Sequence, residues 1–222
     1  MENFKLTKAD MIAVTTLDAT YILNKGAKLY VDGTYRNAVE YYRLASAMGD
    51  VQATSNLGYC YLYGRDIEVN VDLAIAYFTI AASKRNIDAA YKLGDIYSRD
   101  KWVKPDKELS LYYYNMAVAF IIDGEIDDDS EVRWIDRLQD YPSLCFAMGR
   151  EMFIGGSMNT NLRLSYQFLK HAEIGYKREI DNGVDLYKEA YTSVLEYLQK
   201  EEFADVKKEY DSYYDDDIEE EE

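Results

Sequence analysis

The sequence predicts an all-α fold, a right-handed α-solenoid of about four two-helix repeats with capping helices at the N- and C-terminal ends. Three segments with one pattern of aromatic and small residues begin 36 residues apart, at Ala38, Ala74 and Ser110. The pairs Leu57-Gly58 and Leu93-Gly94 keep the same spacing between these segments. A fixed period of this size is typical of stacked two-helix units. The chain of 222 residues also contains only 2 prolines, so few positions would break a helix.

Two further series of residues locate the repeats and an insertion. Polar residues that can cap a helix N-terminus stand before the second helix of each repeat, at Thr34, Asn70, Asp106 and Asn161. Glycines occupy one slot of the first helices, at Gly58, Gly94 and Gly149. Both series end on a spacing of 55 residues instead of 36. The shared excess of 19 residues predicts one insertion between the third and fourth repeats, at about residues 121–139.

These anchors predict the domain organisation. We expect one repeat domain over residues 1–208, with repeats at about 22–49, 53–85, 89–120 and 142–176 and capping helices at about 180–208. Thr7 and Asp10 have the spacing of a capping box that opens a first helix. A glycine inside a helix costs about 1 kcal/mol relative to alanine. Its recurrence at one slot therefore predicts that a neighbouring helix approaches too closely for a side chain.

The charge of the chain argues against several partners. The net charge is −16, and Glu209–Glu222 alone carries nine carboxylates and no base, so we expect an acidic tail at 209–222. Phosphate backbones and anionic lipids repel such a chain, which predicts no binding to nucleic acid or membranes. No stretch approaches the roughly 20 apolar residues that span a bilayer, and the first residues lack the apolar run of a signal peptide. We therefore expect a cytoplasmic protein.

The residues needed for catalysis are scarce. His171 is the only histidine, and Cys60 and Cys145 are far apart with no CxxC spacing, so no zinc site is expected. The acidic run at 127–131 lacks the central glycine and alternating ligands of a calcium loop. The sequence thus predicts no enzyme, no metal and no cofactor. A deep pocket holding His171 beside ionisable neighbours would favour the opposite interpretation.

The first helices carry the pattern A-x-x-x-L-G-x-x-Y, at Ala53–Tyr61 and Ala89–Tyr97. A glycine-containing loop follows the first of these, and an A-x-x-Y/F-x-x-x-A helix comes next. The pattern resembles the Sel-one-like repeat family, a branch of the tetratricopeptide superfamily. Residues 22–48 are more similar to a plain tetratricopeptide unit with a shorter loop, and residues 142–176 are a degenerate copy. The resemblance implies that the first helices line a concave groove, with ligand-contacting positions beside the glycine.

The resemblance implies eight groove residues: Tyr59, Tyr63, Tyr91, Asp95, Arg99, Phe146, Arg150 and Ile154. Mixed Tyr and Arg are typical of binding hot spots, although the same residues could simply be exposed positions. We expect a non-enzymatic protein-interaction module, an adaptor or regulator, that binds a peptide or partner protein in this groove. The alternative is a charge-driven binder of a basic partner through the acidic tail, or a self-regulated module onto which that tail folds back. A homodimer through an exposed end helix is also possible.

Overall fold

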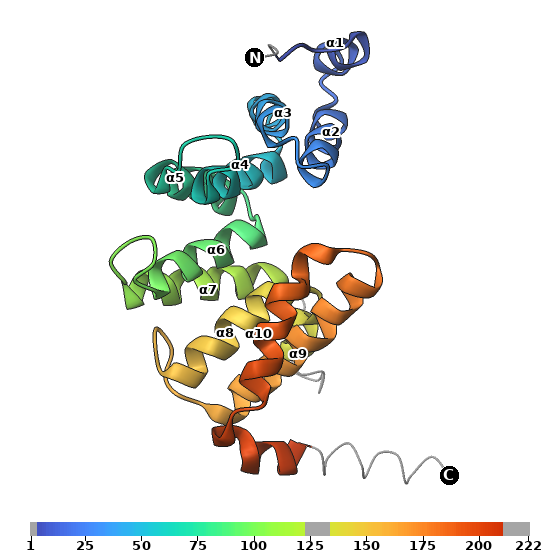
Figure 1. Ribbon diagram of the computed structural model, residues 1–222. Coiled ribbons are helices and arrows are strands. Elements are labelled where there is room, and N and C mark those ends of the chain that lie inside the picture. Colours follow the sequence, from blue (N-terminus) through green and yellow to red (C-terminus); the bar gives the residue numbers. More distant parts are fainter. Residues whose placement is uncertain (1–3, 123–133, 211–222) are drawn as a thin grey trace. The chain divides into compact units, whose positions relative to one another are not determined.

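A computed structural model describes residues 4–122 and 134–210 (Figure 1). Within these ranges every regular element is a helix, and there is no strand. The chain divides into two compact units, unit 1 with Met1–Ile96 and Lys101–Val103, and unit 2 with Tyr97–Asp100 and Lys104–Glu222. Consecutive helices pack against each other in pairs within each unit. The predicted all-α fold class, built from two-helix repeats, is confirmed.

Unit 1 holds the first two repeats and the beginning of the third. Helix α2 pairs with α3, α4 pairs with α5, and α3 also contacts α4. The third repeat opens with α6, whose last two residues belong to unit 2. The helices are α1 (Lys8–Thr15), α2 (Ala19–Val31), α3 (Tyr35–Ala47), α4 (Val51–Tyr63), α5 (Val71–Ser83) and α6 (Ile87–Ser98).

Unit 2 contains one further helix pair and the C-terminal helices. Helix α8 pairs with α9, and α10 packs against α9. Its helices are α7 (Lys107–Ile122), α8 (Pro142–Ile154), α9 (Leu162–Asp181) and α10 (Lys188–Leu198), with short 3-10 turns η1 (Trp134–Asp140), η2 (Asp185–Tyr187) and η3 (Glu201–Phe203). Most of the predicted insertion, with the acidic run at 127–131, lies outside the described residues, as does the tail from residue 211 onward.

The second helices begin at the predicted cap residues. Asn70, Asp106 and Asn161 each accept a hydrogen bond from the backbone N–H three residues later, at 2.9, 2.9 and 3.0 Å. Thr34 also precedes its helix, but its side chain makes no capping hydrogen bond. At the other end, α9 runs to Asp181, five residues beyond the predicted end of the fourth repeat. The predicted start of the capping helices, at residue 180, thus lies inside α9.

The glycine slot is a point of close helix approach, as predicted. A Cβ atom built on Gly58, on Gly149 or on Gly26 of the first repeat would lie under 3.0 Å from a side chain of the paired second helix. For Gly58 and Gly149 the contacted residue comes 20 positions after the glycine, and for Gly26, in the short-loop first repeat, it comes 16 positions after. The pairs are Gly58 with Phe78 at 2.7 Å, Gly149 with Leu169 at 2.9 Å, and Gly26 with Tyr42 at 2.9 Å.

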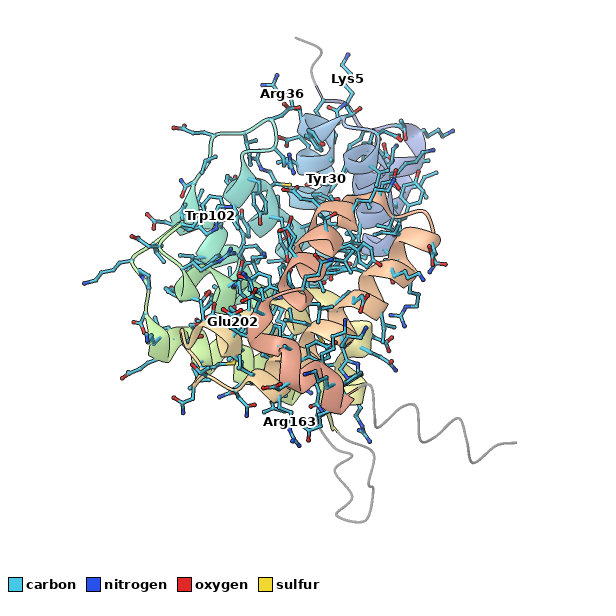
Figure 2. All side chains as sticks on the ribbon, turned by 60° about the horizontal axis from the view of Figure 1, so that its bottom comes forward. Lys5, Tyr30, Arg36, Trp102, Arg163 and Glu202 are labelled. Carbon is cyan, nitrogen blue, oxygen red and sulfur yellow. The ribbon has the colours of Figure 1, made fainter. Side chains whose placement is uncertain are left out.

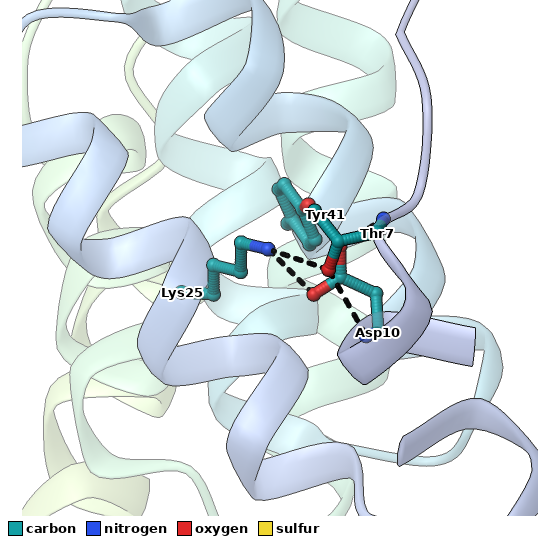
Figure 3. Close-up of polar contacts among 4 residues, drawn as sticks. All are labelled: Thr7, Asp10, Lys25 and Tyr41. Carbon is teal, nitrogen blue, oxygen red and sulfur yellow. Dashed lines mark hydrogen bonds and ion pairs between the residues drawn. The ribbon is translucent and has the colours of Figure 1, made fainter. Parts of the chain in front are cut away.

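A buried polar network attaches α1 to the first repeat (Figure 3). Thr7 and Asp10 form the predicted capping box, because the Asp10 backbone N–H donates to the Thr7 hydroxyl and the Asp10 carboxylate accepts from the Thr7 N–H. Lys25 of α2 donates to Asp10 at 2.6 Å, and the hydroxyl of Tyr41 in α3 donates to it at 2.7 Å. Asp10 is fully buried, so its charge is satisfied entirely by these partners.

Candidate protein-binding surface

Four of the eight predicted groove residues lie together in unit 1. Tyr59 and Tyr63 come from α4, and Tyr91 and Asp95 come from α6. The hydroxyl of Tyr59 donates a hydrogen bond to the hydroxyl of Tyr91 at 3.1 Å. The rings of Tyr59 and Tyr63 stack with their centroids 6.4 Å apart. The spacing of one helical turn puts these two tyrosines on one face of α4.

Lys92 lies among these residues, and reasoning from the sequence did not identify it. Its ammonium group is 5.5 Å from the centroid of the Tyr59 ring, 5.1 Å from that of Tyr91, and 3.4 Å from the Asp95 carboxylate. Burial disfavours the charged form, but attraction to Tyr91 and Asp95 outweighs it and raises the pKa of Lys92. We name Tyr59, Tyr63, Tyr91, Lys92 and Asp95 the Lys92 cluster. The rings of Tyr59 and Tyr91 are therefore already in contact with a cation of the chain itself.

A second set of aromatic residues continues from Tyr63 across the loops of unit 1. The Tyr63 ring meets the Trp102 ring edge-on, with centroids 5.7 Å apart. The guanidinium of Arg65 lies 5.9 Å from the Tyr63 ring centroid, 5.2 Å from that of Tyr35 and 5.9 Å from that of Tyr30. We name these five residues, Tyr30, Tyr35, Tyr63, Arg65 and Trp102, the aromatic strip; Tyr30 and Trp102 are labelled in Figure 2.

The backbone explains how the aromatic strip is assembled. Gly64 ends α4 in the left-handed conformation, at φ 65°, and so turns the chain and leaves Arg65 at the head of the following loop. Arg65 then donates a hydrogen bond from Nε to the hydroxyl of Tyr30 at 3.1 Å. Tyr63 is 40% exposed, and the other four members are half-buried. The sequence argument considered only helix positions beside the glycines, so it overlooked these loop residues.

The other four predicted residues belong to unit 2 and have different surroundings. The Phe146 ring contacts the rings of Tyr176 and Tyr197, at centroid distances of 6.5 and 5.9 Å. Arg150 is buried and pairs with Glu151 at 3.2 Å. Ile154 is 53% exposed, and Arg99 is half-buried.

Aromatic residues of the C-terminal segment cover this face of α8. Tyr197 of α10 contacts Phe153, with ring centroids 5.6 Å apart, in addition to Phe146. Phe203 is 1% exposed and contacts both Phe153 and Tyr166, at 5.1 and 5.3 Å. Of the predicted groove positions on α8, Phe146 is consequently occupied by packing within unit 2, whereas Ile154 stays exposed.

The described residues were also compared with what a reactive thiol, a metal site or a membrane-spanning helix would require. Cys60 and Cys145 are buried free thiols, and burial raises the pKa of Cys60 to about 12. Within residues 4–122 and 134–210, no three His, Cys, Asp or Glu side chains are grouped so that they could hold a metal ion. No helix in those same ranges combines the length and the apolar character needed to cross a membrane.

Comparisons with known proteins agree with the repeat architecture. The model of the family described as Sel1 repeat matches residues 19–50, 51–86 and 87–119. A Sel1 repeat protein from Oxalobacter formigenes is 18% identical with a TM-score of 0.52, over 71% of this chain and 58% of that one. A protective antigen of uropathogenic Escherichia coli, which displays an SLR fold, is 18% identical with a TM-score of 0.43, over 72% of this chain and 40% of the other. No curated protein matches the chain.

Proposed function

We propose that this chain, which belongs to the Sel1 repeat family, is a non-enzymatic module that binds a peptide or a partner protein through the aromatic strip and the adjoining Lys92 cluster. Proteins with Sel1 repeats generally mediate protein–protein interactions. The observation that carries the proposal is the composition of the strip, because Trp, Tyr and Arg are the residue types that dominate interface hot spots.

The construction of the strip supports the same proposal. Its members come from the first repeat (Tyr30, Tyr35), the second (Tyr63, Arg65) and the loop after α6 (Trp102), so it would contact a ligand at several points. Each side chain is held by a ring contact or by Arg65. Because these side chains are ordered before a ligand arrives, binding would cost little further conformational entropy.

The proposal narrows the predicted groove to unit 1. Tyr59, Tyr63, Tyr91 and Asp95 stay in it as members of the Lys92 cluster and the strip. Phe146 and Arg150 are assigned to the internal packing of unit 2, where their side chains are covered or paired. Arg99 and Ile154 also belong to unit 2 and are not part of the proposed surface, although Ile154 is 53% exposed.

Selection from a random peptide library displayed on phage tests the proposal, since it requires no identified partner. We expect the chain to enrich peptides whose affinity, measured by calorimetry, falls about tenfold or more in Tyr63→Ala and Trp102→Ala, as expected for hot-spot residues. Tyr112→Ala is the matched control, since Tyr112 is a 57% exposed tyrosine of α7 outside the strip. Selected peptides that bind all three variants as tightly as the wild type would contradict the proposed surface.

The acidic tail offers a second candidate function, because residues 211–222 carry eight carboxylate side chains and no base. In this alternative, a basic partner binds the tail, or the tail regulates the module. Truncation after Tyr210 separates the two candidates and keeps the Tyr210 ring on Tyr166, with centroids 5.3 Å apart. Unchanged peptide affinity and unchanged salt dependence would support the strip. Loss of binding on truncation would support the tail.

A further inference from the structure

A cavity of about 710 Å³ lies at the N-terminal end of unit 1, apart from the aromatic strip and the Lys92 cluster. It is formed by the segment before α1, by α2 and by the first turns of α3. This volume falls within the range of about 300–1,000 Å³ that ligand pockets usually have. We name it the N-terminal pocket, and its lining residues are Phe4, Lys5, Thr7, Lys25, Leu29, Thr34, Arg36, Asn37 and Tyr41.

The lining of the N-terminal pocket is positively charged. Lys5, Lys25 and Arg36 line it, and it has no acidic lining residue. The carboxylate of Asp10 lies beside it but is fully buried and is bound by Lys25 and Tyr41, so it balances one of the three cations. Two positive charges are therefore left in a chain whose net charge is −16.

Lys5 and Arg36 are available to a ligand. Both side chains are exposed, and neither forms an ion pair with any residue in the described part of the chain. Figure 2 shows both projecting from the same edge of unit 1. The guanidinium of Arg36 has the planar donor geometry that binds a carboxylate with two parallel hydrogen bonds.

The start of α3 adds to this positive potential. Thr34 and Asn37 are the N-cap and third residue of this 13-residue helix, so its N-terminus faces the pocket lining. The first N–H groups of a helix lack acceptors within the helix and favour nearby negative charge. Since the Thr34 side chain makes no capping hydrogen bond, no N-cap side chain satisfies them.

The apolar part of the lining distinguishes between anions. Phe4 and Tyr41 meet edge-on with ring centroids 5.1 Å apart, and Leu29 lies with them in the wall. An apolar wall beside a cationic rim matches a carboxylate with an apolar neighbour better than a small, fully hydrated ion.

We infer that the N-terminal pocket is a second binding site, which takes an acidic peptide segment with an apolar side chain next to its carboxylates. Lys5 and Arg36 bind the carboxylates, and Phe4, Leu29 and Tyr41 contact the apolar side chain. The site shares no residue with the aromatic strip, so the two surfaces can be tested separately.

The test measures the fluorescence anisotropy of a labelled peptide of alternating Glu and Leu residues, titrated with the full chain. We expect saturable binding that weakens about tenfold in Arg36→Gln and further when Lys5→Gln is added, since each change removes a charge-assisted contact. Lys28→Gln is the matched control, because Lys28 is an exposed lysine of α2 outside the lining. The affinity of the Lys28→Gln variant for the labelled peptide should stay within about twofold of that of the wild type.

Several outcomes would overturn this inference. They are the absence of saturable binding, equal affinity for the same peptide with Gln in place of Glu, or an equal loss in Lys28→Gln. Displacement of the probe by low millimolar inorganic phosphate, or by a short single-stranded oligonucleotide, would instead indicate an unspecific anion site. Thermal unfolding of each variant checks folding, and the exposed positions of Lys5 and Arg36 should leave it unchanged.

Discussion

Unit 1 and unit 2 place aromatic residues at equivalent positions of their first helices but surround them differently. Tyr91 lies three residues before Gly94, and Phe146 lies three residues before Gly149. The Tyr91 hydroxyl accepts a hydrogen bond from Tyr59 and its ring faces the Lys92 ammonium group, whereas the Phe146 ring packs against Tyr197 of α10. The same repeat position therefore belongs to a polar cluster around Lys92 in one unit and to an aromatic cluster in the other.

The difference has a physical origin in the chemistry of the side chains. The hydroxyl group of Tyr59 donates a hydrogen bond to that of Tyr91, so polar atoms of both side chains are paired. Phe146 and Phe153 have no polar atom, so their surfaces are favourable only when another element removes them from water. Helix α10 and the segment after it do so, as the terminal element of a repeat stack generally must. Substitutions in unit 2 should thus act on stability, and substitutions in the aromatic strip should act on binding.

The largest expected effect is that of Phe203→Ala in unit 2. Phe203 is almost completely buried against Phe153 and Tyr166, so its truncation should lower the free energy of unfolding by about 3–5 kcal/mol. Urea denaturation, with alkylation of Cys145 as the reporter of unit 2, measures this change. A loss under about 1 kcal/mol would show that the C-terminal segment does not cover α8 in solution.

Substitution of the glycines that contact the second helices should give a smaller loss, and the two units should differ. A Cβ in Gly58→Ala would lie 2.7 Å from the Phe78 ring, and overpacking of this kind costs about 1–3 kcal/mol, part of which the helix preference of alanine offsets. Adding Phe78→Leu to the Gly58→Ala variant should restore the lost free energy of unfolding, which urea denaturation measures. In Gly149→Ala the Cβ would also lie 3.1 Å from the Ser165 carbonyl oxygen, so Leu169→Ala should restore less. Equal restoration in both units would contradict this distinction.

The sequence predicted most of the fold because its signals were local. The period of 36 residues, the capping residues Asn70, Asp106 and Asn161, and the contact glycines Gly58 and Gly149 each depend on a single helix or helix pair. The end of α9 was predicted too early, because the break comes only at Asn182 and Gly183, where φ of the glycine is 89°.

The residues of the candidate site could be predicted from the sequence only in part. Lys92 belongs to it only because its side chain turns toward Tyr59, a tyrosine 33 positions earlier. Arg65 and Trp102 lie in loops, where no helical period assigns a side chain to a face. Phe146 is not part of the candidate site because its ring packs against Tyr197, a residue 51 positions later. Contacts over such separations depend on packing, which a repeat pattern does not encode.

The buried carboxyl group of Asp10 should make the stability of unit 1 sensitive to acid. Burial works against ionisation of Asp10, but hydrogen bonds from Lys25, the Thr7 N–H and Tyr41 prevail and hold the pKa of this carboxyl well below its usual range. The stabilisation is thus fully present above about pH 4, near the unfolded pKa, and decreases as the pH falls toward the lower folded value. Asp10→Asn should cost about 1–2 kcal/mol at pH 7, and the difference from the wild type should shrink toward pH 3. Thermal unfolding across this range measures it; a constant difference would contradict the assigned charge.

The smallest expected effect on stability is that of Tyr63→Ala, which makes it the sharpest contrast with Phe203→Ala. Tyr63 is 40% exposed and mainly loses its ring contacts with Tyr59 and Trp102, so stability should fall by under about 1 kcal/mol. Cys60 reports on unit 1, because burial raises its pKa to about 12 and keeps the thiol protonated and unreactive at pH 8 while the unit is folded. Its alkylation rate should rise by less than about fivefold in Tyr63→Ala, although the same variant loses peptide affinity. A larger rise would mean that Tyr63 supports the fold of unit 1 as Phe203 supports that of unit 2, and the loss of binding would then follow from unfolding.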